Sequence, residues 1–149
     1  MKRQGILILH VIMNMITTGK PYYYKGTTIT PLVPVPQDKS DELVDIEKRN
    51  NHLIVSFPES VQQRWESQIF HRLPTQPTLS PFRFRGKLCV FLNGATLYNE
   101  KKESITDIAD GAYRGKLFFQ FPSITEKDGD SKLTIKLVSL IIMNNTCPW

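Results

Sequence analysis

Cysteine and histidine are scarce in this chain of 149 residues, which contains two cysteines and three histidines. Cys89, Cys147 and the histidines follow none of the spacings that bind zinc, so the sequence predicts no metal site. So few cysteines are also typical of a protein in a reducing compartment. We therefore expect an intracellular protein, in the cytoplasm or nucleus of its host cell.

Long apolar runs are missing too, since no segment reaches the roughly 18 apolar residues of a membrane-spanning helix. The apolar segment 5–16 follows Lys2 and Arg3 and so imitates a signal peptide. His10 and Asn14 interrupt it, and no small-residue cleavage site follows. We expect a buried first strand here, although the length also suits a helix, and neither secretion nor membrane binding.

Enzyme motifs are absent as well. The sequence has no G-x-S-x-G, G-x-x-x-x-G-K-[ST] or H-E-x-x-H motif. Asp107 and Asp110 are close in sequence, and residues 128–130 (DGD) faintly resemble a calcium loop that lacks its other ligand positions. Both stretches are typical of turns. We expect a protein that catalyses no reaction and needs no cofactor.

The composition that remains is that of a folded domain, with 40% hydrophobic and 22% charged residues. The length predicts a single domain, 1–149, with a proline-rich connection at 73–81. The formal net charge of +5 favours an anionic partner.

Two segments near the C-terminus, 114–121 and 132–137, alternate apolar and polar side chains. Such alternation indicates strands with one buried face. Asp128-Gly129-Asp130 supplies a turn between them, in which Gly129 can adopt a positive φ. We therefore predict a hairpin whose apolar face carries Leu117, Phe119, Phe121, Leu133, Ile135 and Leu137.

A third strand is predicted at 82–92, with Phe82, Phe84, Leu88 and Val90 on its apolar face. The Asn93-Gly94 pair that follows is a strong signal for a hairpin, which would join this strand to one at 95–98. Cys89 lies within the strand, and we expect it to pack there as a small apolar residue.

The opposite face of these three strands is basic, with no acidic residue in phase within the runs. It carries Arg83, Arg85, Lys87, Arg114, Lys116, Lys132 and Lys136. Lysine and arginine bind phosphates without regard to sequence, and out-turned rings such as Phe118 stack on unpaired bases. Tyr23, Lys25 and Tyr113 are further candidates for this nucleic-acid-binding surface. The alternative is a solvated sheet face that binds nothing.

The N-terminal half gives mixed signals. Residues 22–30 are β-prone, with Tyr22 and Tyr24 on one face and Tyr23 and Lys25 on the other; one face should be core, and which one stays open. Residues 31–36 (PLVPVP) predict an extended edge or a linker. Residues 38–49 suit a short surface helix or a mobile loop, and 52–57 a strand.

One helix is predicted near 58–72. Ser56 and Glu59 have the spacing of a capping box at its start. Val61, Trp65 and Ile69 recur every four residues, which places them on one buried stripe. Trp65 should therefore lie in the core.

From Pro81 onward the chain resembles the phage- and virus-encoded single-stranded DNA-binding proteins of the helix-destabilising type. The resemblance is carried by residues 110–116 (DGAYRGK) and by the following hairpin, which ends at 133–142. It implies an OB-fold core, a role in DNA replication or recombination, and single-stranded nucleic acid as the partner, DNA in preference to RNA. The chain shares a final aromatic residue, Trp149, with that family, but residues 144–148 are not acidic.

These patterns together predict a mainly β protein. The preferred architecture is an OB-like antiparallel barrel of five strands with one helix near 58–72, and the alternative is a small β-sandwich of jelly-roll type. The preferred function is non-catalytic binding of single-stranded DNA by a basic, aromatic sheet face. The alternative is a protein-interaction or virion structural module without a nucleic-acid role. Both are compatible with a homo-oligomer.

Overall fold

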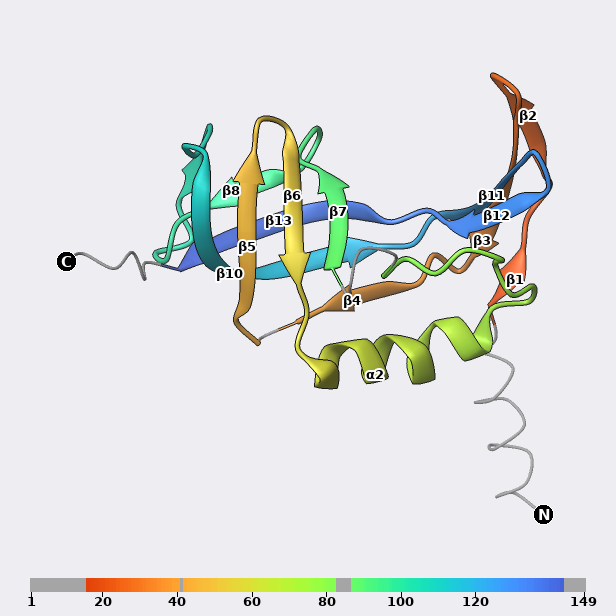
Figure 1. Ribbon diagram of the computed structural model, residues 1–149, viewed down its shortest axis with the longest axis horizontal. Helices are drawn as coiled ribbons and strands as arrows, with labels where there is room; N and C mark the ends of the chain where they lie inside the picture. Colours follow the sequence, from red (N-terminus) through yellow and green to blue (C-terminus); the bar gives the residue numbers. More distant parts are fainter. Residues whose placement is uncertain (1–15, 41, 83–86, 144–149) are drawn as a thin grey trace, which may run out of the picture.

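The computed structural model describes residues 16–40, 42–82 and 87–143, and this part of the chain is mainly β with one short α-helix (Figure 1). The larger sheet contains β4 (Gln37–Lys39), β5 (Val44–Arg49), β6 (His52–Ser56), β7 (Lys87–Phe91), β8 (Thr96–Tyr98), β9 (Ser104–Ile105), β10 (Gly111–Gln120) and β13 (Lys136–Met143). The smaller sheet contains β1 (Thr17–Thr18), β2 (Tyr22–Tyr24), β3 (Thr27–Val33), β11 (Ser123–Lys127) and β12 (Asp130–Leu133). The predicted mainly β class is therefore confirmed.

The larger sheet is curled around a common core. Its strands follow the order β7-β6-β5-β10-β13-β8-β9, and β4 pairs with the second half of β10. β5, β6 and β7 cross in front of β10 and β13 in Figure 1, and side chains from both layers, such as Val55 and Leu117, are buried in one cluster. β13 comes close to β7, but among the described residues no strand pairing joins the two, so the sheet is not closed into a barrel.

The alternation predicted for β10 is confirmed. Leu117, Phe119 and Phe121 are buried, whereas Phe118 is half-buried on the other face. Gly115 lies at a close approach of β10 to β13, because a Cβ there would be 2.7 Å from the carbonyl oxygen of Ile141. Only glycine fits this approach without displacing the backbone.

The predicted hairpin between 114–121 and 132–137 is wrong in its second strand. β10 pairs with β13, and Asp128-Gly129 instead connects β11 to β12, with φ of 53° and 85° at the two turn residues. Leu133 ends β12 in the smaller sheet, and Leu137 lies in β13 of the larger sheet. The alternation misled because both sheets bury the same side of the segment in one core.

Asn93-Gly94 also fails to make the predicted hairpin. Gly94 has a φ of 83° and lies in a turn, in which the amide of Ala95 donates to the carbonyl of Leu92 over 3.0 Å. The strands then separate, since β7 pairs with β6 while β8 pairs in parallel with β13.

Residues 38–49, predicted as a helix or loop, form β4 and β5. Val44, Ile46 and Lys48 alternate inward, and the first two are buried in the core. Lys48 is also nearly buried, and its Nζ lies 2.9 Å from Oδ1 of Asp110. The polar composition of this segment concealed the strand. Lys48 takes an inward position that an apolar residue usually occupies, and it can do so because its ammonium group is paired with a carboxylate.

The smaller sheet extends from the curled sheet as an arm (Figure 1). The prediction of an extended edge or linker at 31–36 is wrong for Pro31–Val33, because this end of β3 pairs with β11 on one side and with β1 on the other. Residues 34–36 form no strand and connect β3 to β4. The carbonyl of Pro31 still accepts a hydrogen bond, from the amide of Gly19 over 2.8 Å. All three tyrosines of β2 are exposed, so neither face of that strand is core.

The connection at 73–81 covers an edge of this arm. The amide of Leu79 donates to the carbonyl of Ser131 over 2.9 Å, and the amide of Ser131 donates to Oγ1 of Thr78 over 2.8 Å. The predicted connection is thus held against β12, which shields a strand edge that would otherwise be free to pair with another chain.

The predicted helix is confirmed as α2 (Glu59–Gln68), which is followed by a 3-10 turn, η1 (Phe70–Arg72). Val61, Trp65 and Ile69 are buried, as the stripe predicted. The capping box is wrong, because Ser56 belongs to β6 and the N-cap residue is Pro58, which has no side-chain cap.

Trp65 is the centre of the aromatic core. Its ring centroid lies 4.8 Å from that of Phe57, 5.3 Å from that of Phe119 and 4.8 Å from that of Phe121. Its indole Nε1 donates to Oδ2 of Asp38 over 2.8 Å, so the polar edge of a fully buried ring is satisfied.

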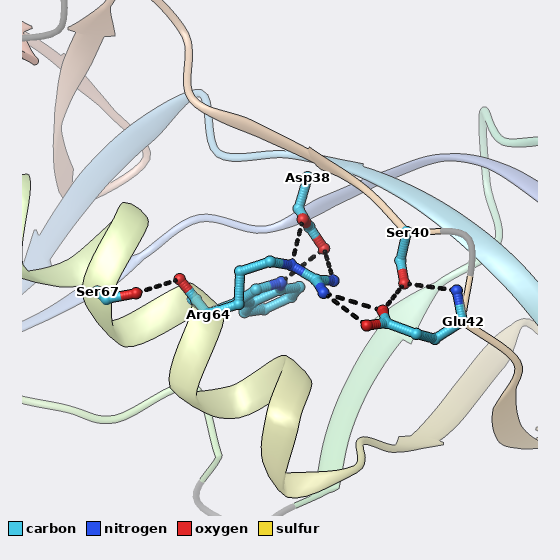
Figure 2. A network of polar contacts seen from close by, with 6 residues as sticks. Asp38, Ser40, Glu42, Arg64 and Ser67 are labelled. Atoms are coloured by element: carbon cyan, nitrogen blue, oxygen red, sulfur yellow. Dashed lines mark hydrogen bonds and ion pairs between the residues drawn. The ribbon is translucent and has the colours of Figure 1, made fainter.

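Arg64, which directly precedes Trp65 in α2, also binds Asp38 (Figure 2). Its Nε and Nη2 each lie 3.1 Å from a carboxylate oxygen of Asp38, and its Nη1 lies 2.9 Å from both carboxylate oxygens of Glu42. Glu42 also accepts a hydrogen bond from Ser40. These contacts fasten α2 to β4 and to the segment after it.

We predict that Asp38→Ala destabilises the protein by about 1–3 kcal/mol, because the buried Trp65 N–H loses its acceptor. Glu42→Gln is the matched control and should cost less than about 1 kcal/mol, since its ion pair is exposed on one side. Urea unfolding curves measure both values. Equal losses in the two variants would show that the indole bond contributes nothing of its own.

A second prediction concerns acid stability. The hydrogen bond from Lys48 lowers the pKa of the Asp110 carboxyl. Such a carboxyl stabilises the fold above its unfolded pKa of about 4, and the contribution is lost as the pH falls through its folded pKa. Between about pH 6 and pH 3, the urea midpoint of the wild type should therefore fall further than that of Asp110→Asn. Parallel curves would mean that the ion pair does not act on stability.

Candidate nucleic-acid interface

The predicted basic face is divided among several surfaces. Lys87 is exposed at the start of β7, and Lys132 is exposed on β12 of the smaller sheet. Arg114 and Lys116 lie on the outer face of β10, and Lys136 begins β13. Arg83 and Arg85 lie outside the described residues. The five basic positions that the structure describes therefore do not form the single sheet face that their shared phase predicted.

Acidic side chains interrupt the outer face at its β5 end. Arg114 pairs with Asp45 across the strands, and its Nε lies 3.3 Å from Oδ1 of that residue. Within β5 itself, Nη2 of Arg49 lies 2.9 Å from Oε1 of Glu47. The absence of acids within each run was a correct observation, but the neighbours of a strand come from other segments.

Tyr113 does not join the outer surface. It pairs with the buried Ile46 of β5, so its side chain lies on the inner side of the sheet. Its hydroxyl donates to the carbonyl of Ala109 over 2.6 Å. This tyrosine holds the turn before β10.

A cleft of about 570 Å³ lies between β7 and the smaller sheet. Its walls come from β7, from the β2–β3 hairpin, from β11 and β12, and from the segment that leads to β13. The lining residues are Tyr24, Lys25, Thr27, Ile29, Ser80, Pro81, Leu88, Cys89, Val90, Phe91, Thr125, Lys132, Leu133, Thr134 and Ile135.

Two aromatic rings of this cleft are unusually exposed, Tyr24 at 57% and Phe91 at 61%. The ring of His52 lies 4.5 Å from that of Phe91, and the Nζ of Lys25 lies 5.2 Å from the centre of the Tyr24 ring. Exposed large rings, one of them beside a lysine, are typical of a surface that a partner covers.

The three tyrosines of β2 face two different hollows. Tyr22 and Tyr24 pair with Ile29 and Thr27, which line the cleft. Tyr23 pairs with Thr28, which lines a separate polar groove of about 450 Å³. Tyr23 therefore points away from the cleft, while its neighbour Lys25 lines it.

Cys89 is exposed and lines the cleft, so the expectation that it packs in the core is wrong. Leu88 and Val90 take the inward positions of β7. Phe91, which the sequence analysis missed, shares the outer phase of Lys87 and Cys89. That phase was the available signal, because it placed a large ring on the basic face.

Among the described residues, no three His, Cys, Asp or Glu side chains gather where they could hold a metal ion. In the same part of the chain, no helix has both the length and the apolar character that crossing a membrane requires.

Comparison of the chain with protein-family models, with curated proteins and with solved structures gives no significant match. The resemblance to helix-destabilising proteins therefore stays a prediction, and the site is defined by its geometry.

We predict that the thiol of Cys89 reacts with a small maleimide in the folded protein, since it is exposed. A Cys147→Ser background isolates this thiol. The control places a cysteine one position further in the same strand, as Val90→Cys in a background without Cys89 and Cys147, and it should react only after unfolding because Val90 is buried. Mass spectrometry of both proteins without denaturant decides; an unreactive Cys89 would show that another segment covers the cleft.

Proposed function

We propose that this protein binds single-stranded nucleic acid in the cleft between β7 and the smaller sheet, without catalysing a reaction. The observation that carries the proposal is the pair of exposed rings, Tyr24 and Phe91, in one cleft with Lys25 and Lys132. Rings and lysines in one groove supply both contacts that a single strand offers, namely base faces and phosphates.

The chemistry favours unpaired bases. In a duplex each base face is covered by its neighbours, so an aromatic side chain can stack only on a base that has left the helix. Each such stack contributes about 1–3 kcal/mol and accepts any base. None of the cleft lysines forms an ion pair with another described residue, so their charges are free to bind phosphate.

We also propose that the larger sheet is an open, OB-like arrangement of β5, β6, β7, β10 and β13. OB-folds bind oligonucleotides on the face of their second and third strands and with the loop between the fourth and fifth. In chain order these parts correspond to β6, β7 and the connection that contains β11 and β12. The cleft lies between these two regions, which supports both parts of the proposal.

The net charge of +5 agrees with a polyanionic partner. Together with the resemblance at 110–142, it favours a protein that covers single-stranded DNA during replication or recombination.

Fluorescence anisotropy with a labelled oligonucleotide tests the proposal. Tyr24→Ala and Phe91→Ala should each weaken binding by about 1–3 kcal/mol, because each removes one stacking ring. Tyr23→Ala is the matched control, since it removes an exposed tyrosine from the opposite face of the same strand, and it should bind as the wild type does. A loss of the same size in Tyr23→Ala would place the site outside the cleft.

Salt dependence gives an independent reading. Affinity should fall steeply as salt is raised, and Lys132→Gln should reduce the slope of log affinity against log salt by roughly one. Absence of any binding at low salt would exclude the function and favour the protein-interaction module.

A further inference from the structure

Phe118 lies on the outer face of β10, away from the cleft. It is half-buried and points to the side opposite the buried Leu117 and Phe119. Its partner across the strands is Lys39 on β4 and Ser139 on β13. The neighbouring position on the same face of β10 is Lys116.

Two further registers complete the surroundings of this ring. Lys116 pairs with Ile141, and Gln120 pairs with Lys136. Lys39, Lys116 and Lys136 therefore lie around Phe118, and among the described residues none of the cross-strand partners on this part of the outer face is acidic. Unlike Arg114, which pairs with Asp45, none of the three lysines forms an ion pair with another described residue. We call Lys39, Lys116, Phe118 and Lys136 the β10 patch.

The β10 patch and the cleft lie on different walls of the curled sheet. Leu88 on β7 and Leu117 on β10 point inward into one buried cluster, so the outer faces of their strands point away from each other. Figure 1 shows β7 in front of β10 and β13. No residue of the β10 patch lines the cleft. A short oligonucleotide bound at one surface therefore leaves the other free.

We propose that the β10 patch is a second binding surface for single-stranded nucleic acid, so that one molecule holds two separate strand segments at once. This inference rests on the function proposed for the cleft. It follows because both surfaces carry an aromatic ring that is at least partly exposed beside lysines that form no ion pair among the described residues, a combination that binds base and phosphate together. Phe91 on β7 and Phe118 on β10 lie on outer faces that the core separates. These two rings therefore cannot stack on adjacent bases of one short oligonucleotide.

Native mass spectrometry with a six-nucleotide oligothymidylate measures the number of strands bound by each molecule. The wild type should bind two. Lys116→Gln/Lys136→Gln should bind one, through the cleft, and Phe91→Ala/Lys132→Gln should bind one, through the β10 patch. Lys101→Gln/Lys102→Gln is the matched control, because it removes the same two positive charges from the loop between β8 and β9. This variant should still bind two.

A second readout detects both strands on one molecule. Two oligonucleotides with donor and acceptor dyes should show energy transfer when mixed with wild-type protein, and this signal should disappear in either double variant. A single bound strand in the wild type, removed by one pair of substitutions alone, would overturn the second surface and leave single-strand binding intact. No bound strand at all would overturn the proposed function itself.

Discussion

The packing of Trp65 against the end of β10 is the contact on which the arrangement of the two sheets depends. Its ring touches Phe119 and Phe121, and its N–H is bonded to Asp38 of β4. The chain leaves the larger sheet for the smaller one directly after Phe121, whose amide donates to the carbonyl of Pro36 over 2.9 Å. One side chain therefore joins α2, two strands and the junction between the sheets.

The aromatic residues of the core are buried, whereas those of the cleft are exposed. Rings that hold the fold are gathered under α2, where burial of a large ring contributes most. Tyr24 and Phe91 remain more than half exposed. Contact of these rings with water is unfavourable, and burial against a partner would remove this free-energy cost. The exposed rings belong to the strand edge and hairpin that face each other across the cleft. This division supports the proposal that the cleft is a binding groove for a flat, base-like ligand and not a gap left by loose packing.

The sequence predicted those features that the residues of a single segment determine. The stripe Val61, Trp65 and Ile69 fixed the helix, and the alternation in β10 fixed which residues are buried, because both periods are properties of a single segment. Strand partners could not be predicted in the same way, since β10 pairs with β13, which follows it, and with β4 and β5, which lie more than 60 positions before it. The cleft could not be predicted either, because it combines β7 with a hairpin more than 50 positions earlier. Lys48 shows a further limit: its charge suggested a surface position, whereas Asp110 allows it to lie nearly buried.

The central claim is that unpaired nucleic acid occupies the cleft between β7 and the β2–β3 hairpin. Amide chemical shifts test this claim most directly, because they report on all segments of the protein at once. They are followed in isotope-labelled protein during titration with a short oligothymidylate. The largest changes should fall on β7, on Tyr24 and Lys25, and on residues 132–135. The loop between β8 and β9 should be unaffected. Changes centred on that loop, with β7 and the hairpin unmoved, would contradict the claim.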